Sequence, residues 1–486
     1  MSTENSSVAP SHASPSTVTG RRAALPLLVV LFASFMDLLD VTIVTVAAPS
    51  IAEDLHATQA QLQWMLAAYT LALGSGLITG GRIGDEYGRR KVFLASLAGF
   101  AIASAACALA PSAGVLIAMR LLQGIAGGFM VPQVFGIIRS SFDAASMAKA
   151  FGAYGAIQGL ASVAGPLLGG ALVDSDLWGM AWRTIFWVNV PVAVVALVLG
   201  VRVLPESTAE RRARLDVAGA VLSALAIALI LLPLVQGRDW GWPWWGWVPL
   251  AAGVGLLGVF VAYERELASR GGRPVLEPGL LRIKTFTAGL AASVLFFGAL
   301  GSFFLVLSLY LQAGTGRSAW DTGLVILPYA IGSVVTSGLG VQLAARGGRV
   351  LLVTGSLVLA VSQTVIWVLV RDGGQPGYWP LAAALFLGGL GLGLAAPILL
   401  NVVLAGVPGR HAGAVGGALS TVNQIGGAVG VAALGTVFFT ALGPAPSTAD
   451  VFGSALATVM PWQVVAYLAA ALLMLALPKT ASAHQA

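Results

Sequence analysis

The chain has 486 residues, of which 57% are hydrophobic and only 9% are charged. A soluble globular chain carries roughly 25% charged residues, so this composition excludes an ordinary soluble enzyme and indicates that lipid is the main solvent. The formal net charge of +6 does not indicate a nucleic-acid partner, because the basic residues lie in short loops between long apolar runs.

The two ends of the chain and its cysteine content set further limits. Residues 1–22 are rich in Ser, Thr, Ala and Pro and predict a disordered cytoplasmic tail. Arg21-Arg22 precedes an apolar run of more than 20 residues, so we expect a retained first helix; a twin-arginine export signal is the alternative. The single cysteine, Cys107, excludes an intrachain disulfide, and the four histidines lie outside the apolar spans or at their edges. We therefore expect no metal site and no cofactor.

Long apolar runs occupy most of the remaining sequence. A bilayer core about 30 Å thick needs about 20 helical residues, and backbone groups in lipid must be paired within their own segment, so each run is expected to be a helix. We expect an all-α integral membrane protein with fourteen transmembrane helices. The predicted spans are 24–47, 62–82, 92–110, 114–138, 150–173, 184–203, 216–236, 246–264, 285–311, 322–345, 350–370, 379–404, 412–440 and 454–477.

The basic residues predict the orientation of these spans. With the N-terminus inside, the 26 Lys and Arg residues divide into 21 in cytoplasmic segments, four in external loops and one, Arg120, within a span. This distribution satisfies the positive-inside rule, and we expect both termini in the cytoplasm. The external loop after the seventh span carries five tryptophans whose rings suit the headgroup layer: Trp240, Trp242, Trp244, Trp245 and Trp247.

A loop sequence recurs in the two parts of the chain. Gly81 to Lys91 follows the second span, and a decayed copy, Gly340 to Arg349, follows the tenth. The repeat predicts two pseudo-symmetric six-helix halves, residues 23–205 and 285–478, with two inserted helices and their linkers at 206–284 and a cytoplasmic tail at 479–486. Substrate is expected to bind between the halves near mid-membrane.

Several motifs together resemble those of the major facilitator superfamily, in particular its fourteen-helix drug:proton antiporters, the QacA/EmrB-like multidrug efflux branch. The matching segments are Leu39 to Pro49 in the first span, Gly81 to Lys91, Leu116 to Gly124 in the fourth span, Gly152 to Gly170 in the fifth, Trp182 to Pro191, and Gly413 to Gly430. Ala161 stands where the fifth-span motif usually has glycine. The resemblance covers essentially all of residues 22–478.

The resemblance implies a proton-coupled antiporter, not an enzyme, that exports amphiphilic drugs or antibiotics across the cytoplasmic membrane by alternating access. Its implied partners are a small amphiphilic substrate, protons and the lipid bilayer, and it is expected to function as a monomer. Two alternatives stay open. One is a facilitator or importer of a native metabolite on the same fold, and the other is a membrane enzyme or sensor that has lost transport.

Three ionisable residues, Asp37, Asp40 and Arg120, lie deep within predicted spans. Charge there is costly enough that a function is the default hypothesis. Asp37 and Asp40 are three residues apart and share a helix face, so each disfavours ionisation of the other, as a proton carrier requires. Arg120 and Asp40 lie at similar depths and could pair. We expect Asp40 to be the principal proton-exchanging group and Asp37 the secondary one; a permanent structural ion pair of Asp40 and Arg120 is the alternative.

Other candidate residues serve conformational change or substrate contact. The loop motif (Gly81, Asp85, Gly88, Arg89 and Arg90) is expected to latch one conformation, with Asp85 at the N-terminus of the following helix. In the fifth span, Gly165 and Gly169 make a flat face and Pro166 permits a bend. Candidate cavity residues are Gln123, Gln158, Asn423, Phe35 and Phe304.

Overall fold

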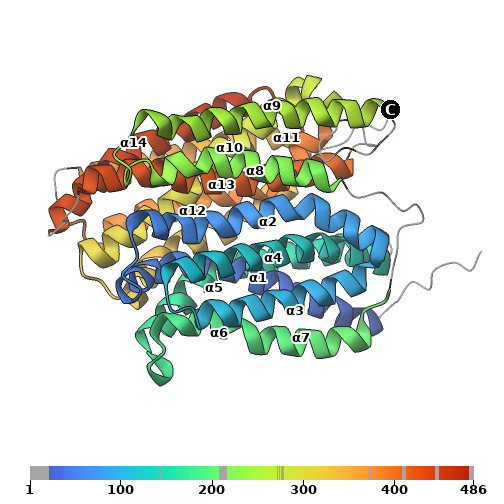
Figure 1. Ribbon diagram of the computed structural model, residues 1–486, viewed down its shortest axis with the longest axis horizontal. Helices are drawn as coiled ribbons and strands as arrows, with labels where there is room; N and C mark the ends of the chain where they lie inside the picture. The colour runs from blue at the N-terminus through green and yellow to red at the C-terminus, as the bar shows by residue number, and fades with distance from the viewer. Residues whose placement is uncertain are drawn as a thin grey trace, which may run out of the picture.

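The computed structural model describes residues 21–142, 144–206, 216–270, 272, 274, 278–371, 375–407, 412–443 and 448–480. This part of the chain consists of helices joined by short turns, and the helices run along the long axis of the molecule (Figure 1). The predicted all-α class is confirmed. The predicted tails, residues 1–22 and 479–486, lie largely outside the described residues.

The first part of the chain forms seven helices: α1 (Arg21–Asp54), α2 (Gln59–Tyr87), α3 (Arg89–Ala108), α4 (Ala113–Ser141), α5 (Ala144–Asp174), α6 (Thr184–Trp187) and α7 (Asn189–Val203). Side-chain caps start two of them. Thr58 and Gln61 form a capping box at α2, and the Ser112 hydroxyl accepts the Val115 N–H at α4. These caps satisfy backbone donors that have no partner inside the helix.

The second part forms α8 (Val217–Gln236), α9 (Trp247–Ser269), α10 (Lys284–Leu309), α11 (Ala319–Val370), α12 (Tyr378–Ala405), α13 (Ala412–Leu442) and α14 (Ala449–Met474). Asp216 caps α8 and Ser318 caps α11. A π-helical turn, Tyr310–Gly314, continues α10. Helix α11 contains two successive apolar stretches separated by a break at Gly347, where the backbone is not helical (φ −156°, ψ 40°).

Among the described residues, twelve helical stretches are long and apolar enough to cross a membrane, or up to thirteen if the bent α2 counts as one span. The prediction of a polytopic membrane protein is therefore confirmed at twelve spans, and the predicted fourteen is not reached by this measure. Two predicted spans account for the difference. The second corresponds to α2, which bends by 46° between Leu77 and Thr79, and the fifth corresponds to α5, which is not among the twelve.

The helices pack in two sets with corresponding partners. In the first set, α1 packs against α5, and both α2 and α3 pack against α4; in the second, α10 packs against α13, and α11 packs against α12 and α14. The sets meet through α2 with α13 and α5 with α11. The α8–α9 hairpin lies beside this junction, where α8 contacts α2 and α13 (Figure 1).

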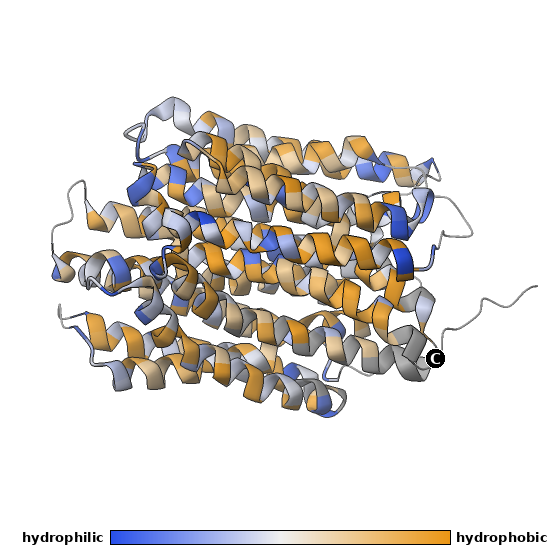
Figure 2. Ribbon diagram, turned by 90° about the horizontal axis from the view of Figure 1, so that it is seen from below, coloured by the Kyte–Doolittle hydropathy of each residue, from blue (hydrophilic) through white to orange (hydrophobic). Residues whose placement is uncertain are grey.

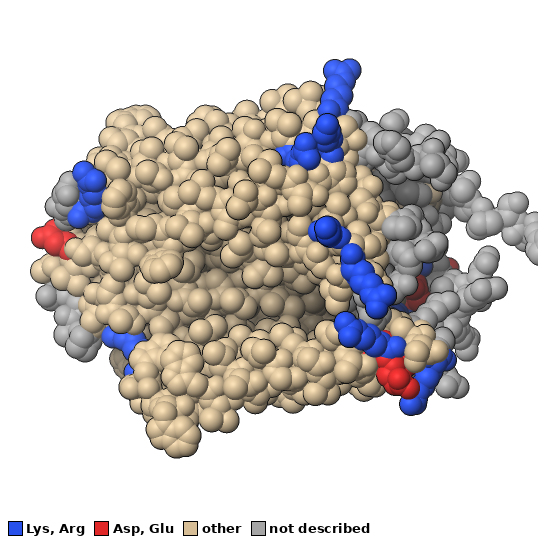
Figure 3. Space-filling view, turned by 90° about the horizontal axis from the view of Figure 1, so that it is seen from above, with Lys and Arg blue, Asp and Glu red and all other residues tan. Residues whose placement is uncertain are grey.

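The outer surface of the bundle is apolar. Large side chains such as Ile102, Val350 and Leu472 are 65–71% exposed, which is a liability in water and the normal state of a lipid-facing residue. Hydrophilic residues gather near the helix ends (Figure 2). The charged residues visible in the space-filling view also lie near the two ends of an otherwise uncharged surface that carries a hollow (Figure 3).

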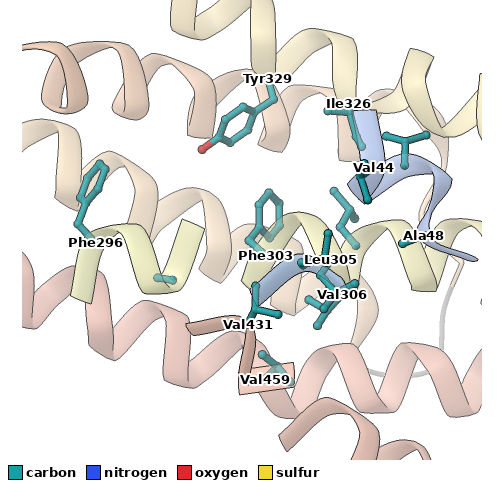
Figure 4. Packing of buried hydrophobic residues seen from close by; sticks show 14 of the residues in the cluster. Val44, Ala48, Phe296, Phe303, Leu305, Val306, Ile326, Tyr329, Val431 and Val459 are labelled. Atoms are coloured by element: carbon teal, nitrogen blue, oxygen red, sulfur yellow. The ribbon is translucent and has the colours of Figure 1, made fainter. Parts of the chain in front are cut away.

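The two sets of helices join at one end of the bundle, near the C-terminal ends of α1, α5 and α10. There Val44 and Ala48 of α1 pack among Phe303 and Val306 of α10 and Ile326 of α11 (Figure 4). Hydrogen bonds cross the same junction: Gln312 donates to the Val46 carbonyl at 2.7 Å, and Asp174 accepts the backbone N–H groups of Ala319 at 3.2 Å and Trp320 at 3.0 Å. A second core, nearer the other end of the first set, contains only residues between 29 and 204.

Candidate functional site

Asp40, in the middle of α1, is the centre of a buried polar cluster. Its carboxylate accepts hydrogen bonds from Arg120 Nη1, from Gln123 Nε2 at 2.9 Å and from Asn189 Nδ2 at 2.8 Å. Asp40 and Gln123 are 0% exposed, and Arg120 and Asn189 are 1% exposed. Burying a carboxylate is tolerated only when it is paired and hydrogen-bonded, and three donors from α4 and α7 meet that condition. The predicted pairing of Asp40 with Arg120 is confirmed.

Arg120 is held by several groups besides Asp40. Its Nη1 also donates to Gln123 Oε1 at 2.9 Å, and its Nε donates to the Met65 carbonyl of α2 at 3.4 Å. The guanidinium carbon lies 4.0 Å from the centroid of the Tyr69 ring and 5.9 Å from that of Phe186. A planar guanidinium suits this combination of stacking and directed donation.

Neutral groups of α3, α6 and α7 orient the side chains that contact Asp40. Asn189 Nδ2 also donates to the Ser104 hydroxyl at 3.0 Å, and that hydroxyl donates to the Phe186 carbonyl at 2.9 Å. The Cys107 thiol donates a hydrogen bond to Gln123 Oε1, with 3.6 Å between the sulfur and the oxygen. Helices α3 and α7 therefore fix the amides that contact Asp40.

Asp37 lies one helical turn before Asp40. It is 9% exposed and accepts a 2.7 Å hydrogen bond from the Tyr69 hydroxyl of α2. On the α4 side it faces Gly127, where a Cβ atom would lie only 2.7 Å from Asp37 Oδ1. Tyr69 also lies under the Arg120 guanidinium that pairs with Asp40, so this side chain joins the surroundings of the two carboxylates.

The loop motif forms the sharp turn between α2 and α3. Gly88 has φ +104°, a conformation that favours glycine. Asp85 pairs with Arg89 at 2.9 Å, and Arg89 Nη1 donates to the Gly136 carbonyl of α4 at 3.2 Å. At the start of α3 the Glu206 carboxylate accepts the Arg90 N–H at 3.2 Å, while the Asp85 carboxylate accepts from the side chain of Arg89, the first residue of this helix.

The small residues of α5 allow two neighbouring helices to approach. A Cβ at Gly165 would lie 1.9 Å from Thr42 Oγ1, and one at Gly169 would lie 2.9 Å from Ile43 Cγ1, both on α1. On the other side, the Pro166 carbonyl would lie 2.6 Å from a Cβ at Gly323 of α11. Gly165 and Gly169, on the flat face predicted for the fifth span, therefore contact α1, whereas Pro166 makes the contact of α5 with α11.

The structure separates the candidate cavity residues. Gln123 belongs to the Asp40 cluster and is fully buried, so it is not exposed to a substrate in this conformation, contrary to the prediction. Phe35 and Asn423 are half-buried, and the half-buried Phe304 packs at 5.1 Å against the Tyr329 ring. The side chain of Gln158 lies outside the described residues.

Sequence reasoning assigned no role to Tyr69, Ser104 or Asn189. Asn189 lies inside a motif that could have pointed to it, but neutral polar residues in membrane helices commonly serve as helix-to-helix contacts. Tyr69 carries no such signal. Among the described residues, no group of three or more His, Cys, Asp or Glu side chains is placed to hold a metal ion.

Comparison with known sequences identifies the family of this fold. The sequence profile of the Major Facilitator Superfamily matches residues 30–431. The chain is 41% identical over 435 residues to the "Probable actinorhodin transporter" of Streptomyces coelicolor, covering 89% of the chain and 75% of that protein. It is 35% identical to the "Tetracenomycin C resistance and export protein" of Streptomyces glaucescens, covering 86% and 76% respectively. It is 32% identical to the "Multidrug efflux pump LfrA" of Mycolicibacterium smegmatis, covering 87% and 82%.

Solved structures support the same fold at lower identity. A bacterial homologue of the human drug peptide transporters PepT1 and PepT2 superposes with a TM-score of 0.66 at 15% identity, covering 93% of this chain and 98% of that one. A bacterial homologue of the human lysosomal transporter Spinster gives a TM-score of 0.65 at 16% identity, covering 94% and 97%. The prediction of a transporter, and not an enzyme, agrees with every one of these matches.

Proposed function

Because the chain belongs to the Major Facilitator Superfamily, we propose that it is a proton-coupled antiporter that exports amphiphilic antibiotics or drugs across the cytoplasmic membrane by alternating access. Relatives named for actinorhodin transport, tetracenomycin C export, puromycin resistance and multidrug efflux support the substrate class. The combination of motifs in the first, fourth and fifth spans favours the fourteen-helix drug:proton branch.

The observation that carries proton coupling is the set of ionisable side chains buried inside an apolar bundle. A charged residue at the bilayer centre costs about 2.5–3.5 kcal/mol or more, so a chain keeps one there for a use. Asp40, Asp37 and Arg120 lie together on α1 and α4. We assign proton exchange to the carboxylates of Asp37 and Asp40. Arg120 is assigned the role of linking the ionisation of one carboxylate to that of the other.

The energetics of exchange are adequate without a nucleotide. One proton that crosses about 150 mV releases roughly 3.5 kcal/mol, which supports a substrate gradient of about two to three decades. A proton that binds a carboxylate of this set weakens its attraction for Arg120. The contacts between α1 and α4 can then change, and this change would couple proton binding to the motion of the two halves.

The proposed architecture is fourteen spans arranged 6+2+6, with α2 and α5 as the spans beyond the twelve. Corresponding glycine contacts support two related halves. In each half, two glycines spaced four residues apart on one helix lie against the backbone of two residues with the same spacing on an earlier helix. In the first half, Gly124 and Gly128 of α4 lie against Tyr69 and Leu73 of α2. In the second half, Gly389 and Gly393 of α12 lie against Tyr329 and Ser333 of α11. The α8–α9 hairpin is the two-helix insertion.

The conformation is proposed to be open toward the cytoplasm. The distribution of basic residues places the C-terminal ends of α1, α5 and α10 outside, and the contacts between Asp174 and α11 and between Gln312 and α1 lie at that end. The Arg89 contacts with Asp85 and Gly136 lie at the opposite, cytoplasmic end. They are proposed to fix the turn of the loop motif while the cytoplasmic side is open.

The direction of transport tests this proposal against import. Inverted membrane vesicles that contain the protein should accumulate puromycin or tetracenomycin C when their interior is made acidic, and cells that express the gene should tolerate more of the same compound. Vesicles without the protein are the control. Proton-driven accumulation in right-side-out vesicles instead would indicate an importer and would contradict the proposal.

A further inference from the structure

Tyr69 makes two contacts with the ionisable set through one rigid side chain. Its hydroxyl donates to Asp37 Oδ1 at 2.7 Å, and the Arg120 guanidinium carbon lies 4.0 Å from its ring centroid. The residue is 0% exposed. The Tyr69 side chain therefore lies between Asp37 and Arg120 and contacts both.

We propose that Tyr69 is the positioning residue of the coupling site: it holds Asp37 as the carboxyl that binds and releases the proton in this conformation, and it transmits the charge of Asp37 to Arg120. This inference rests on the proposed proton antiport and names the carboxyl that exchanges the proton and the residue that positions it.

The two carboxylates differ in what surrounds them. Asp40 is 0% exposed and has three donors, one of them the Arg120 cation, whereas Asp37 is 9% exposed and accepts a hydrogen bond from one neutral hydroxyl. Charge-assisted hydrogen bonds are roughly twice as strong as neutral ones, so the contacts around Asp40 hold that carboxylate more firmly than the single Tyr69 contact holds Asp37. We therefore assign the exchanged proton to Asp37, the less tightly held carboxylate of the pair.

The groups that face Asp37 come from four helices. Asp40 lies one turn away on α1, Tyr69 contacts it from α2, Arg120 acts on it from α4, and Tyr154 lies within electrostatic range on α5. A proton taken from water converts the Asp37 carboxylate to a neutral carboxyl. Tyr69 keeps its own proton, and the net change near Arg120 is the loss of one negative charge.

Gly127 leaves room for this arrangement. A methyl group at this position of α4 would lie 2.7 Å from Asp37 Oδ1 and 3.3 Å from the Tyr69 hydroxyl. Gly127→Ala should therefore displace the carboxylate from Tyr69 without removing any polar atom. Like Tyr69→Phe, this substitution weakens the Tyr69–Asp37 hydrogen bond, but it acts from α4 and not from α2.

Infrared spectroscopy of the purified, reconstituted protein can test the proposal without a transported substrate. The carbonyl band of a protonated carboxyl is followed during a pH titration, and Asp37→Asn identifies the part of the band that belongs to Asp37. Tyr69→Phe keeps the ring and removes the donor to the anion. The midpoint of the Asp37 band should then move to higher pH by about one to two pH units, and Gly127→Ala should move it in the same direction.

Tyr329→Phe is the matched control, because its buried hydroxyl has no hydrogen-bond partner among the described residues. It should leave the Asp37 band unchanged. An unchanged midpoint in both Tyr69→Phe and Gly127→Ala, or an equal shift in Tyr329→Phe, would overturn the proposal. Wild-type protein that titrates as expected but shows no proton-coupled transport would instead contradict the proposed function.

Discussion

The Asp40 side chain is held in place by buried polar contacts. It is surrounded by Arg120, Gln123 and Asn189, and each of these side chains is at least 99% buried. Removal of one partner from a buried ion pair leaves an uncompensated charge, at a cost of about 3–5 kcal/mol. Substitution of either partner is therefore expected to be strongly destabilising.

Arg120→Lys should fail although it keeps the positive charge. Lysine cannot reproduce the donation to Asp40, Gln123 and Met65 together with the stacking on Tyr69. We expect drug-driven proton release to fall by about tenfold or more, which corresponds to a loss of about 1.4 kcal/mol or more. The measurement is proton flux in proteoliposomes. Arg183→Lys is the matched control, because the Arg183–Asp54 pair is 29% and 48% exposed and such surface pairs contribute little.

At the residue scale, the sequence predicts the charged members of the site and not the neutral ones. Asp40 and Arg120 could be paired in advance because charge inside an apolar span is rare and their depths match. Tyr69, Ser104 and Asn189 could not, because a neutral polar side chain in a membrane helix is equally compatible with contact to lipid, to another helix or to the site. Their role depends on helix rotation, which hydropathy does not determine.

Helix α5 is the element that contacts both sets of helices. It lies against α1 through Gly165 and Gly169 and against α11 through Pro166 and Asp174. Because Gly165 and Gly169 have no side chains, α5 can approach α1 closely. At the end of α5, the Asp174 carboxylate binds the N-terminus of α11. Movement of the halves must alter at least one of these contacts.

Gly165→Ala should separate α1 and α5. The added methyl group would lie 1.9 Å from Thr42 Oγ1, and overpacking of this kind typically costs about 1–3 kcal/mol. Both the thermal unfolding temperature in detergent and transport should fall. Gly255→Ala on α9, where no heavy atom lies within 4 Å of the added group, should change stability by no more than about 0.5 kcal/mol. Equal effects of the two substitutions would contradict the close contact.

Asp174→Ala should loosen the junction between the halves. The carboxylate caps α11 from α5, and loss of a cap costs about 1 kcal/mol, roughly fivefold in a two-state equilibrium. Spin labels at the exposed positions Leu109 and Trp379 (67% and 79% exposed) should report a broader distance distribution. Asp176→Ala is the control, since the Asp176 carboxylate accepts the Ala181 N–H within its own loop and, among the described residues, makes no hydrogen bond with α11. Identical distributions in the two variants would rule out a role for this contact.

At the element scale, the positions of most helices were predictable because length and apolarity are properties of a segment alone. The break at Gly347 within α11, the bend of α2 and the 3₁₀ turns before α6 depend on neighbouring helices and loops. The partner of the α3 N-terminus was also missed, because Glu206 is 116 residues away from Arg90 in the sequence.

The whole molecule is an apolar bundle whose two sets of helices meet near one end. Which end faces the cytoplasm follows from the basic residues: 21 of the 26 lie in segments predicted to be cytoplasmic. Reporter fusions at the C-terminus should therefore be active only in the cytoplasm. A fusion active outside the cell would reverse the orientation of the last span and would also remove the argument for a cytoplasm-open conformation.

The most direct test of the central claim is proton release driven by substrate in oriented proteoliposomes that contain a pH-sensitive dye. Puromycin or tetracenomycin C should release protons from the wild-type protein. Asp40→Asn keeps the side-chain volume, removes the charge that holds Arg120 and leaves that cation beside Asp37, so it should bind substrate but release no protons. Wild-type proton release by Asp40→Asn would mean that the Asp40–Arg120 pair is only structural and would contradict the mechanism.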